Sequence, residues 1–195
     1  MVDSSIRRKF GIEIEKGLRD IGLSISGTYP LLKVYPFYTL EIDFDNNIAT
    51  IWYGYQHEML WTGEIYANEV IRMFKYLHNK ITNRPFDDED FLESIYSIWK
   101  SSITEFGDKV PIRYIADKYA NTVTEYNYRE YTYVFFSYDL YRLKIRRIDD
   151  MEINLVVATR AYTRRIQDFL WVPYNKRLGG SYISHIKFRK IKSHL

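Results

Sequence analysis

Residues 38–55 read YTLEIDFDNNIATIWYGY and predict a β-hairpin. Apolar and polar side chains alternate over residues 38–45, which is the period of a strand with one buried face. Asn46 and Asn47 follow, and asparagine tolerates the positive φ angles of a two-residue hairpin turn. A second strand over 48–55 then pairs with the first. A third strand at 58–62 completes an antiparallel meander.

The expected two-residue turn fixes the register of the hairpin. It pairs Asp45 with Ile48, Asp43 with Thr50 and Glu41 with Trp52. Because side chains in a strand alternate between faces, this register also fixes the buried face. The buried residues would be Leu40, Ile42 and Phe44 beside Ala49, Ile51 and Tyr53.

Helical spacing precedes and follows the hairpin. Residues 6–21 carry apolar side chains three or four apart, which is one face of a helix, with Gly22 as its end; a short strand at 11–15 is the alternative. A helix with Asn68 as its cap should end before Pro85, because proline interrupts helices. Further helices are predicted after Asp87, whose acidic neighbours suit a helix N-terminus, and from Pro111 to Ala120.

The last third of the sequence favours strands. Residues 131–145 are rich in aromatic and apolar side chains, although 137–147 also fits a helix. A turn at Asp149-Asp150 separates this segment from a strand over 152–159, and residues 181–190 alternate again. The predicted class is α+β, with an N-terminal helix, an antiparallel β-meander, a helical middle and C-terminal antiparallel strands. We expect one domain over 1–195, with possible sub-parts at 1–66, 67–125 and 126–195.

Composition narrows the class of protein. The 195 residues are 46% hydrophobic and 27% charged, as in folded globular proteins. No cysteine is present, which excludes disulfides, thiol nucleophiles and cysteine-ligated zinc. Residues 1–22 lack the apolar centre of a signal peptide, and no apolar run reaches the ~20 residues that span a bilayer. The sequence therefore predicts a cytoplasmic protein without a membrane partner.

Charge is distributed unevenly along the chain. Residues 1–138 carry 15 Lys+Arg and 20 Asp+Glu, whereas residues 139–195 carry 13 Lys+Arg and 5 Asp+Glu. Clustered cations with exposed rings are what phosphate backbones and stacked bases require. We therefore expect a non-catalytic protein or complex subunit that contacts nucleic acid. The predicted contact residues are Arg142, Arg160, Arg164, Arg165, Lys176, Arg177, Lys187 and Arg189, with Tyr162 and Tyr174 for stacking.

Two other functions stay open. A protein–protein adaptor within a larger assembly is one, because Trp52 lies on the polar face of the predicted hairpin and tryptophan is enriched in interface hot spots. A metal-dependent nuclease is the other, because Glu41, Asp43 and Asp45 share one strand face and carboxylates bind Mg²⁺. A solvated strand face also explains these three carboxylates.

Short motifs add little to these alternatives. The sequence contains no Walker A, G-x-G-x-x-G or G-x-S-x-G motif, so no cofactor and no catalytic residue are predicted. Arg72 and His78, six residues apart, are similar to the Arg-to-His motif of HEPN ribonucleases. Residues 109–119 resemble the supporting helix of a helix-turn-helix. Ser184 and His185 are adjacent, so on a regular strand they should point to opposite faces.

Overall fold

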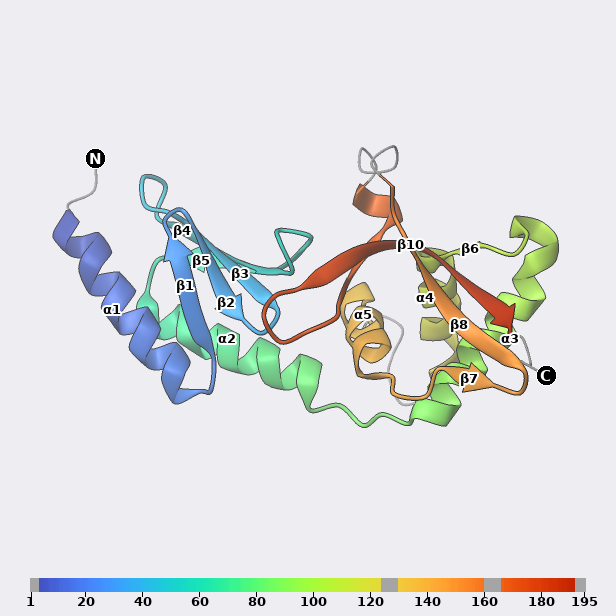
Figure 1. Ribbon diagram of the computed structural model, residues 1–195. Coiled ribbons are helices and arrows are strands. Elements are labelled where there is room, and N and C mark those ends of the chain that lie inside the picture. Colours follow the sequence, from blue (N-terminus) through green and yellow to red (C-terminus); the bar gives the residue numbers. More distant parts are fainter. Residues whose placement is uncertain (1–3, 124–129, 160–165, 192–195) are drawn as a thin grey trace. The chain divides into compact units, whose positions relative to one another are not determined.

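The computed structural model describes residues 4–123, 130–159 and 166–191 (Figure 1). The chain forms two compact units. Unit 1 contains Met1–Arg84 and Pro173–Gly180, and unit 2 contains Pro85–Val172 and Ser181–Leu195. The expectation of a single domain stays a prediction. The α+β class and its order of elements are confirmed by helices α1 to α5 and two antiparallel sheets.

Unit 1 combines two helices with a five-stranded antiparallel meander in the order β1-β2-β3-β4-β5 (Figure 1). The predicted first helix is confirmed, because it buries Phe10, Ile14 and Leu18 at four-residue intervals. The elements are α1 (Ser4–Asp20), β1 (Ser24–Thr28), β2 (Leu31–Tyr35), β3 (Tyr38–Asp43), β4 (Ile48–Tyr53), β5 (Glu58–Glu64) and α2 (Ala67–Thr82).

Helix α2 packs against the buried face of this sheet. The Phe74 ring meets the Tyr38 ring edge-on at 5.8 Å between centroids. The predicted cap is wrong: Asn68 lies inside the helix, and Tyr66 precedes it without a side-chain cap. Strands β1 and β2 were not anticipated. Most residues of these two strands are exposed, and the exposed positions hold both apolar and polar side chains. The alternation of polarity is therefore weak there.

The hairpin register differs from the prediction by two residues. Asp43 pairs with Ile48 and Glu41 with Thr50, so the connection spans residues 44–47. The Asp43 carboxylate explains the longer turn, because its Oδ1 accepts from the backbone N–H groups of both Asp45 and Asn46. A shift of two residues leaves every strand residue on its predicted face.

Unit 2 combines three helices with a second antiparallel sheet in the order β6-β10-β8-β7, and β9 also pairs with β10. Trp99 of α3 packs against Phe188 of β10 at 5.2 Å between ring centroids. The elements are α3 (Asp88–Phe106), β6 (Val110–Pro111), α4 (Ile112–Thr122), α5 (Tyr133–Arg142), β7 (Arg147–Ile148), β8 (Met151–Val157), η1 (Ile166–Asp168), β9 (Leu170–Pro173) and β10 (Gly180–Lys190).

The predicted strand over 131–145 is wrong, and the helical alternative at 137–147 is confirmed only over 137–142. Residues 133–142 form α5, and the Thr132 side chain caps it by accepting from the Phe135 backbone N–H. Buried residues cover so much of the helix surface that the sequence shows almost no helical period. Among the described helices, none combines the length and the apolar character that a membrane span needs.

Candidate nucleic-acid interface

Arg142 is held inside unit 2 and is not part of a basic strand. Because α5 replaces the predicted strand, Arg142 is the last residue of a helix. Its guanidinium forms an ion pair with Asp139 at 2.7 Å and donates to the Pro85 carbonyl at 3.2 Å. It also lies 4.0 Å from the centroid of the Phe86 ring. These contacts use the positive charge of Arg142 within the protein.

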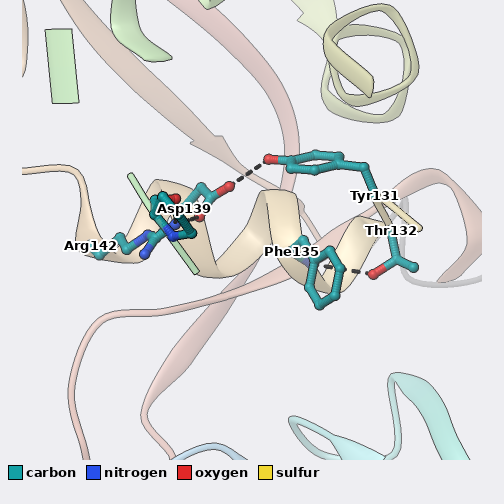
Figure 2. Close-up of polar contacts among 6 residues, drawn as sticks. Tyr131, Thr132, Phe135, Asp139 and Arg142 are labelled. Atoms are coloured by element: carbon teal, nitrogen blue, oxygen red, sulfur yellow. Dashed lines mark hydrogen bonds and ion pairs between the residues drawn. The ribbon is translucent and has the colours of Figure 1, made fainter. Parts of the chain in front are cut away.

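Asp139 is the centre of that cluster, and its two oxygens are shared between two partners. The Tyr131 hydroxyl donates to Oδ2 at 2.6 Å, and Arg142 Nε donates to Oδ1 at 2.9 Å (Figure 2). Asp139 is only 2% exposed. A buried carboxylate is tolerated when such partners satisfy it, so removal of either partner would leave a buried charge uncompensated.

The polar face of the second sheet keeps the other predicted cations of unit 2. Lys187 lies opposite Asn154, and Arg189 lies opposite Glu152. Glu152 in turn lies opposite Arg147 of β7. Directly opposed residues in antiparallel strands share a face, so these five side chains lie on the same side of the sheet. Lys187 and Arg189, both predicted as contact residues, therefore share one face of β10.

Exposure differs along this face. The side chains of Arg147 and Glu152 are 65% and 48% exposed, and they form a salt bridge of 3.2 Å. Arg189 is also exposed, whereas Lys187 is only 8% exposed. Arg147 and Arg189 therefore present charge to the solvent from both sides of a single carboxylate.

The remaining described cations of the predicted set lie in unit 1, in the turn of residues 173–180. Leu178 anchors the turn, because its side chain is fully buried and its backbone N–H donates to the Pro36 carbonyl at 3.0 Å. The Asn175 side chain holds the tip by accepting from the backbone N–H groups of Arg177 and Gly179. Besides Asn175, the turn exposes Tyr174, Lys176 and Arg177.

The predicted contact residues therefore divide into three groups. Lys187 and Arg189 belong to unit 2 with Arg142, and the turn of residues 173–180 belongs to unit 1. Four further predicted residues, Arg160, Tyr162, Arg164 and Arg165, lie outside the described residues. The structure thus supports a cationic face within unit 2 and a separate cationic turn within unit 1.

Sequence reasoning missed Arg147, although a signal for it was present. The turn at Asp149-Asp150 was predicted, and a strand after that turn needs a partner strand ending just before it. Such a partner places Arg147 beside Glu152, as observed. The longer predicted strand over 131–145 obscured this short pairing.

Two carboxylates of the acidic row, those of Glu41 and Asp43, accept hydrogen bonds from neighbouring residues of unit 1. Glu41 Oε2 accepts from Trp52 Nε1 and from Gln56 Nε2, each at 3.0 Å. The Asn46 side chain and backbone N–H lower the pKa of Asp43 by hydrogen bonding to its carboxylate. Glu41, Asp43 and Asp45 line one open pocket of about 400 Å³, together with Arg7. Within the residues that the structure describes, no cluster of side chains is suited to hold a metal ion.

The two residues of the HEPN-like pair, Arg72 and His78, make different contacts from α2. Arg72 is exposed and pairs with Glu69 at 3.6 Å. His78 Nδ1 instead shares a hydrogen bond of 2.9 Å with the Tyr38 hydroxyl, and burial lowers the pKa of His78. Residues 112–122 are helical, as the helix-turn-helix resemblance implies, but residues 124–129 after them lie outside the described part of the chain.

Ser184 and His185 do not point to opposite faces as predicted. A register irregularity between Ile183 and His185 breaks the alternation, and His185 Nδ1 lies 2.9 Å from Ser184 Oγ. Ser184 Oγ also donates to the Val156 carbonyl at 3.2 Å. Burial, followed by the nearby charge of Lys109, lowers the pKa of His185.

Comparison with known proteins places the chain beside none of them. No protein-family model, curated protein or solved structure matches it. A functional interpretation therefore depends on the side chains of the two units alone.

Proposed function

We propose that the chain is a non-catalytic protein or complex subunit that contacts nucleic acid through the polar face of β7, β8 and β10. The observation that carries this proposal is the charge of that face. The paired residues of the three strands contribute Arg147, Lys187 and Arg189 against one carboxylate, Glu152. Cations gathered on one face attract phosphates and release the counterions bound to them.

The turn of residues 173–180 supports the proposal from unit 1. Tyr174 is 66% exposed, and Lys176 and Arg177 stand beside it on a turn held by Asn175 and Leu178. An exposed ring with adjacent cations is suited to stack a base and neutralise its phosphate. Because the backbone is already fixed, little conformational entropy is lost on binding.

The test is the salt dependence of binding to short single- and double-stranded DNA and RNA. We expect Arg147→Ala/Arg189→Ala to flatten the log–log salt slope by about 1.8 on duplex DNA or about 1.4 on single strands. The matched control is Lys9→Ala/Arg19→Ala, because those cations are also exposed and paired with glutamates, but on α1. Equal slopes in both double variants contradict the assignment to this face, and absent binding at low salt removes the function.

A second experiment separates the contribution of the turn. Lys176→Ala/Arg177→Ala should flatten the slope, whereas Tyr174→Ala should weaken binding to single strands by about 1–3 kcal/mol at constant slope. Leu178 is kept in every variant, so the turn remains anchored. If single- and double-stranded ligands lose the same affinity in Tyr174→Ala, stacking is not its role.

A protein–protein adaptor is the second candidate, favoured by the outward face of the unit 1 sheet. Leu31, Ile48 and Met59 are 36%, 43% and 58% exposed there. Trp52 is a poor probe of this face, because its Nε1 donates to Glu41. Met59→Glu is better, and it should abolish copurification of a defined partner protein without lowering the unfolding temperature. A partner retained by this variant argues against the adaptor function of the face.

A further inference from the structure

Lys187 is an unusual residue on the polar face of β10. Its side chain is 8% exposed, yet its Nζ is not fully enclosed, so the apolar stem is covered while the ammonium reaches solvent. No hydrogen bond or ion pair joins this ammonium to another side chain in residues 4–123, 130–159 and 166–191. The ammonium of Lys187 is therefore open to a negatively charged ligand from the solvent.

The neighbours of Lys187 add positive charge. His185 and Arg189 flank it on the same face of β10. On the other side, β6 pairs Pro111 with His185 and Val110 with Ile186, and Lys109 directly precedes β6. Burial, followed by the charge of Lys109, lowers the pKa of His185.

No acidic side chain occupies the strand positions that pair with His185 and Lys187. Asn154 faces Lys187 from β8, and its neutral amide offers a further donor. Val156 of β8 and Pro111 of β6 face His185. Glu152 stands one row further along and pairs with Arg147. The positions around Lys187 therefore gather donors and cations from three segments of unit 2.

We infer that Lys109, His185 and Lys187 form a binding site for one phosphoryl group. Two ammonium groups supply charge-assisted contacts, and the His185 imidazole and the Asn154 amide supply further donors. The phosphoryl group belongs either to a nucleic-acid backbone or to a free phosphate ester. The inference deepens the proposed function and rests on it only where the ligand is a nucleic-acid backbone. Titration with inorganic phosphate tests the site without nucleic acid.

The experiment follows the imidazole of His185 by NMR in the full chain during titration with inorganic phosphate at constant ionic strength. We expect a saturable shift of the His185 resonances and a rise in the pKa of His185, because a bound anion favours the imidazolium. The charge of Lys109 acts on this ring, Lys187 lies two residues further along the same strand face, and Ser184 is the hydrogen-bond partner of the ring. Shifts that do not saturate, or that sulfate and chloride reproduce equally, overturn the inference.

Variants test the residues. Lys109→Gln and Lys187→Gln should each weaken phosphate binding about tenfold or more, the loss expected for one charged hydrogen bond. If Lys187→Gln fails to fold, Lys109→Gln still tests the site, because Lys109 is exposed and its substitution leaves the fold intact. The matched control is Lys190→Gln. Lys190 directly follows Arg189, which faces the site, but the ammonium of Lys190 pairs with Asp150 at 3.2 Å. Equal phosphate affinity in Lys109→Gln and Lys190→Gln removes the site.

The two sources and the two proposals give different results. A phosphate site without oligonucleotide binding identifies a free phosphate ester as the ligand and rejects the nucleic-acid function. Oligonucleotide binding that depends on Arg147 and Arg189, without a phosphate response at His185, keeps the function and rejects the site. When both occur, Lys109→Gln should also flatten the salt slope by about 0.7–0.9.

Discussion

Arg142 and Arg189 belong to the same unit but differ in where their charge is used. The Arg142 side chain is 16% exposed and is paired with Asp139, which is 2% exposed. Arg189 is exposed at the end of β10, and its cross-strand neighbour Glu152 is already paired with Arg147. The difference teaches that a basic stretch of sequence contains cations of two kinds. Those that pair inside the fold stabilise it, and only the others create a field for a ligand.

The largest expected effect is on the buried side of this comparison. Asp139→Ala should destabilise unit 2 by about 3–5 kcal/mol, because it leaves the Arg142 guanidinium without its carboxylate. Denaturant unfolding followed by hydrogen exchange in α5 measures the loss. Asp139→Asn is the control for the hydrogen bonds alone. A loss below about 1 kcal/mol in Asp139→Ala means that the pair behaves like a surface salt bridge.

Tyr131→Phe should cost less, about 2 kcal/mol, since it removes one donor to a charged acceptor and keeps the ring. The Tyr131 hydroxyl lies 2.6 Å from Asp139 Oδ2, and the ring also packs against Tyr119 at 5.2 Å between centroids. The unfolding midpoint of this variant is compared with that of Asp139→Ala/Tyr131→Phe. Additive losses would show that the hydroxyl does not act through Asp139.

Arg189→Ala should change the free energy of unfolding by no more than about 0.5 kcal/mol, as exposed charges usually do. Its effect should instead fall on the salt slope of nucleic-acid binding. Arg142→Ala is expected to show the reverse, a clear loss of stability with an unchanged slope in the folded protein. The same two measurements on both variants therefore test the distinction directly, and a shared response would break it.

The smallest expected effect is electrostatic. Lys109→Gln should raise the pKa of His185 toward its ordinary value of 6.5, because it removes the smaller of the two causes that lower it. A lowered pKa in the folded state gives stability that is present above pH 6.5 and lost as pH falls through the folded value. Lys109→Gln should weaken this loss of stability on acidification. The imidazole titration by NMR checks the shift, and an unchanged pKa contradicts the proximity of Lys109.

Local patterns predicted much of the fold but less of the candidate site. Strand β3 and helix α3 follow from alternation, acidic N-terminal residues and Gly107, which adopts a φ of 74° at the helix end. Helix α5 did not follow, because its aromatic residues are buried on most sides and propensity favoured a strand. The fate of Arg142 could not be seen either, since its pairing with Asp139 requires that helix.

The membership of residues 173–180 in unit 1 was not predicted. That membership depends on Leu178, which reaches the Pro36 carbonyl across most of the sequence. No periodicity or local preference encodes a contact at such separation. The same limit applies to the site at Lys187, because the pairing of β6 with β10 joins residues far apart in the chain.

The placement of Leu178 has a consequence for biosynthesis. Most of unit 1 precedes Pro85 in the chain, but the turn that carries the buried Leu178 follows only after Val172. At roughly 5–20 residues per second, the ribosome needs on the order of 4–18 s to make the intervening segment Pro85–Val172. The meander is therefore synthesised before Leu178, and the hydrogen bond from Leu178 to the Pro36 carbonyl can form only after α3, α4 and α5 have been made.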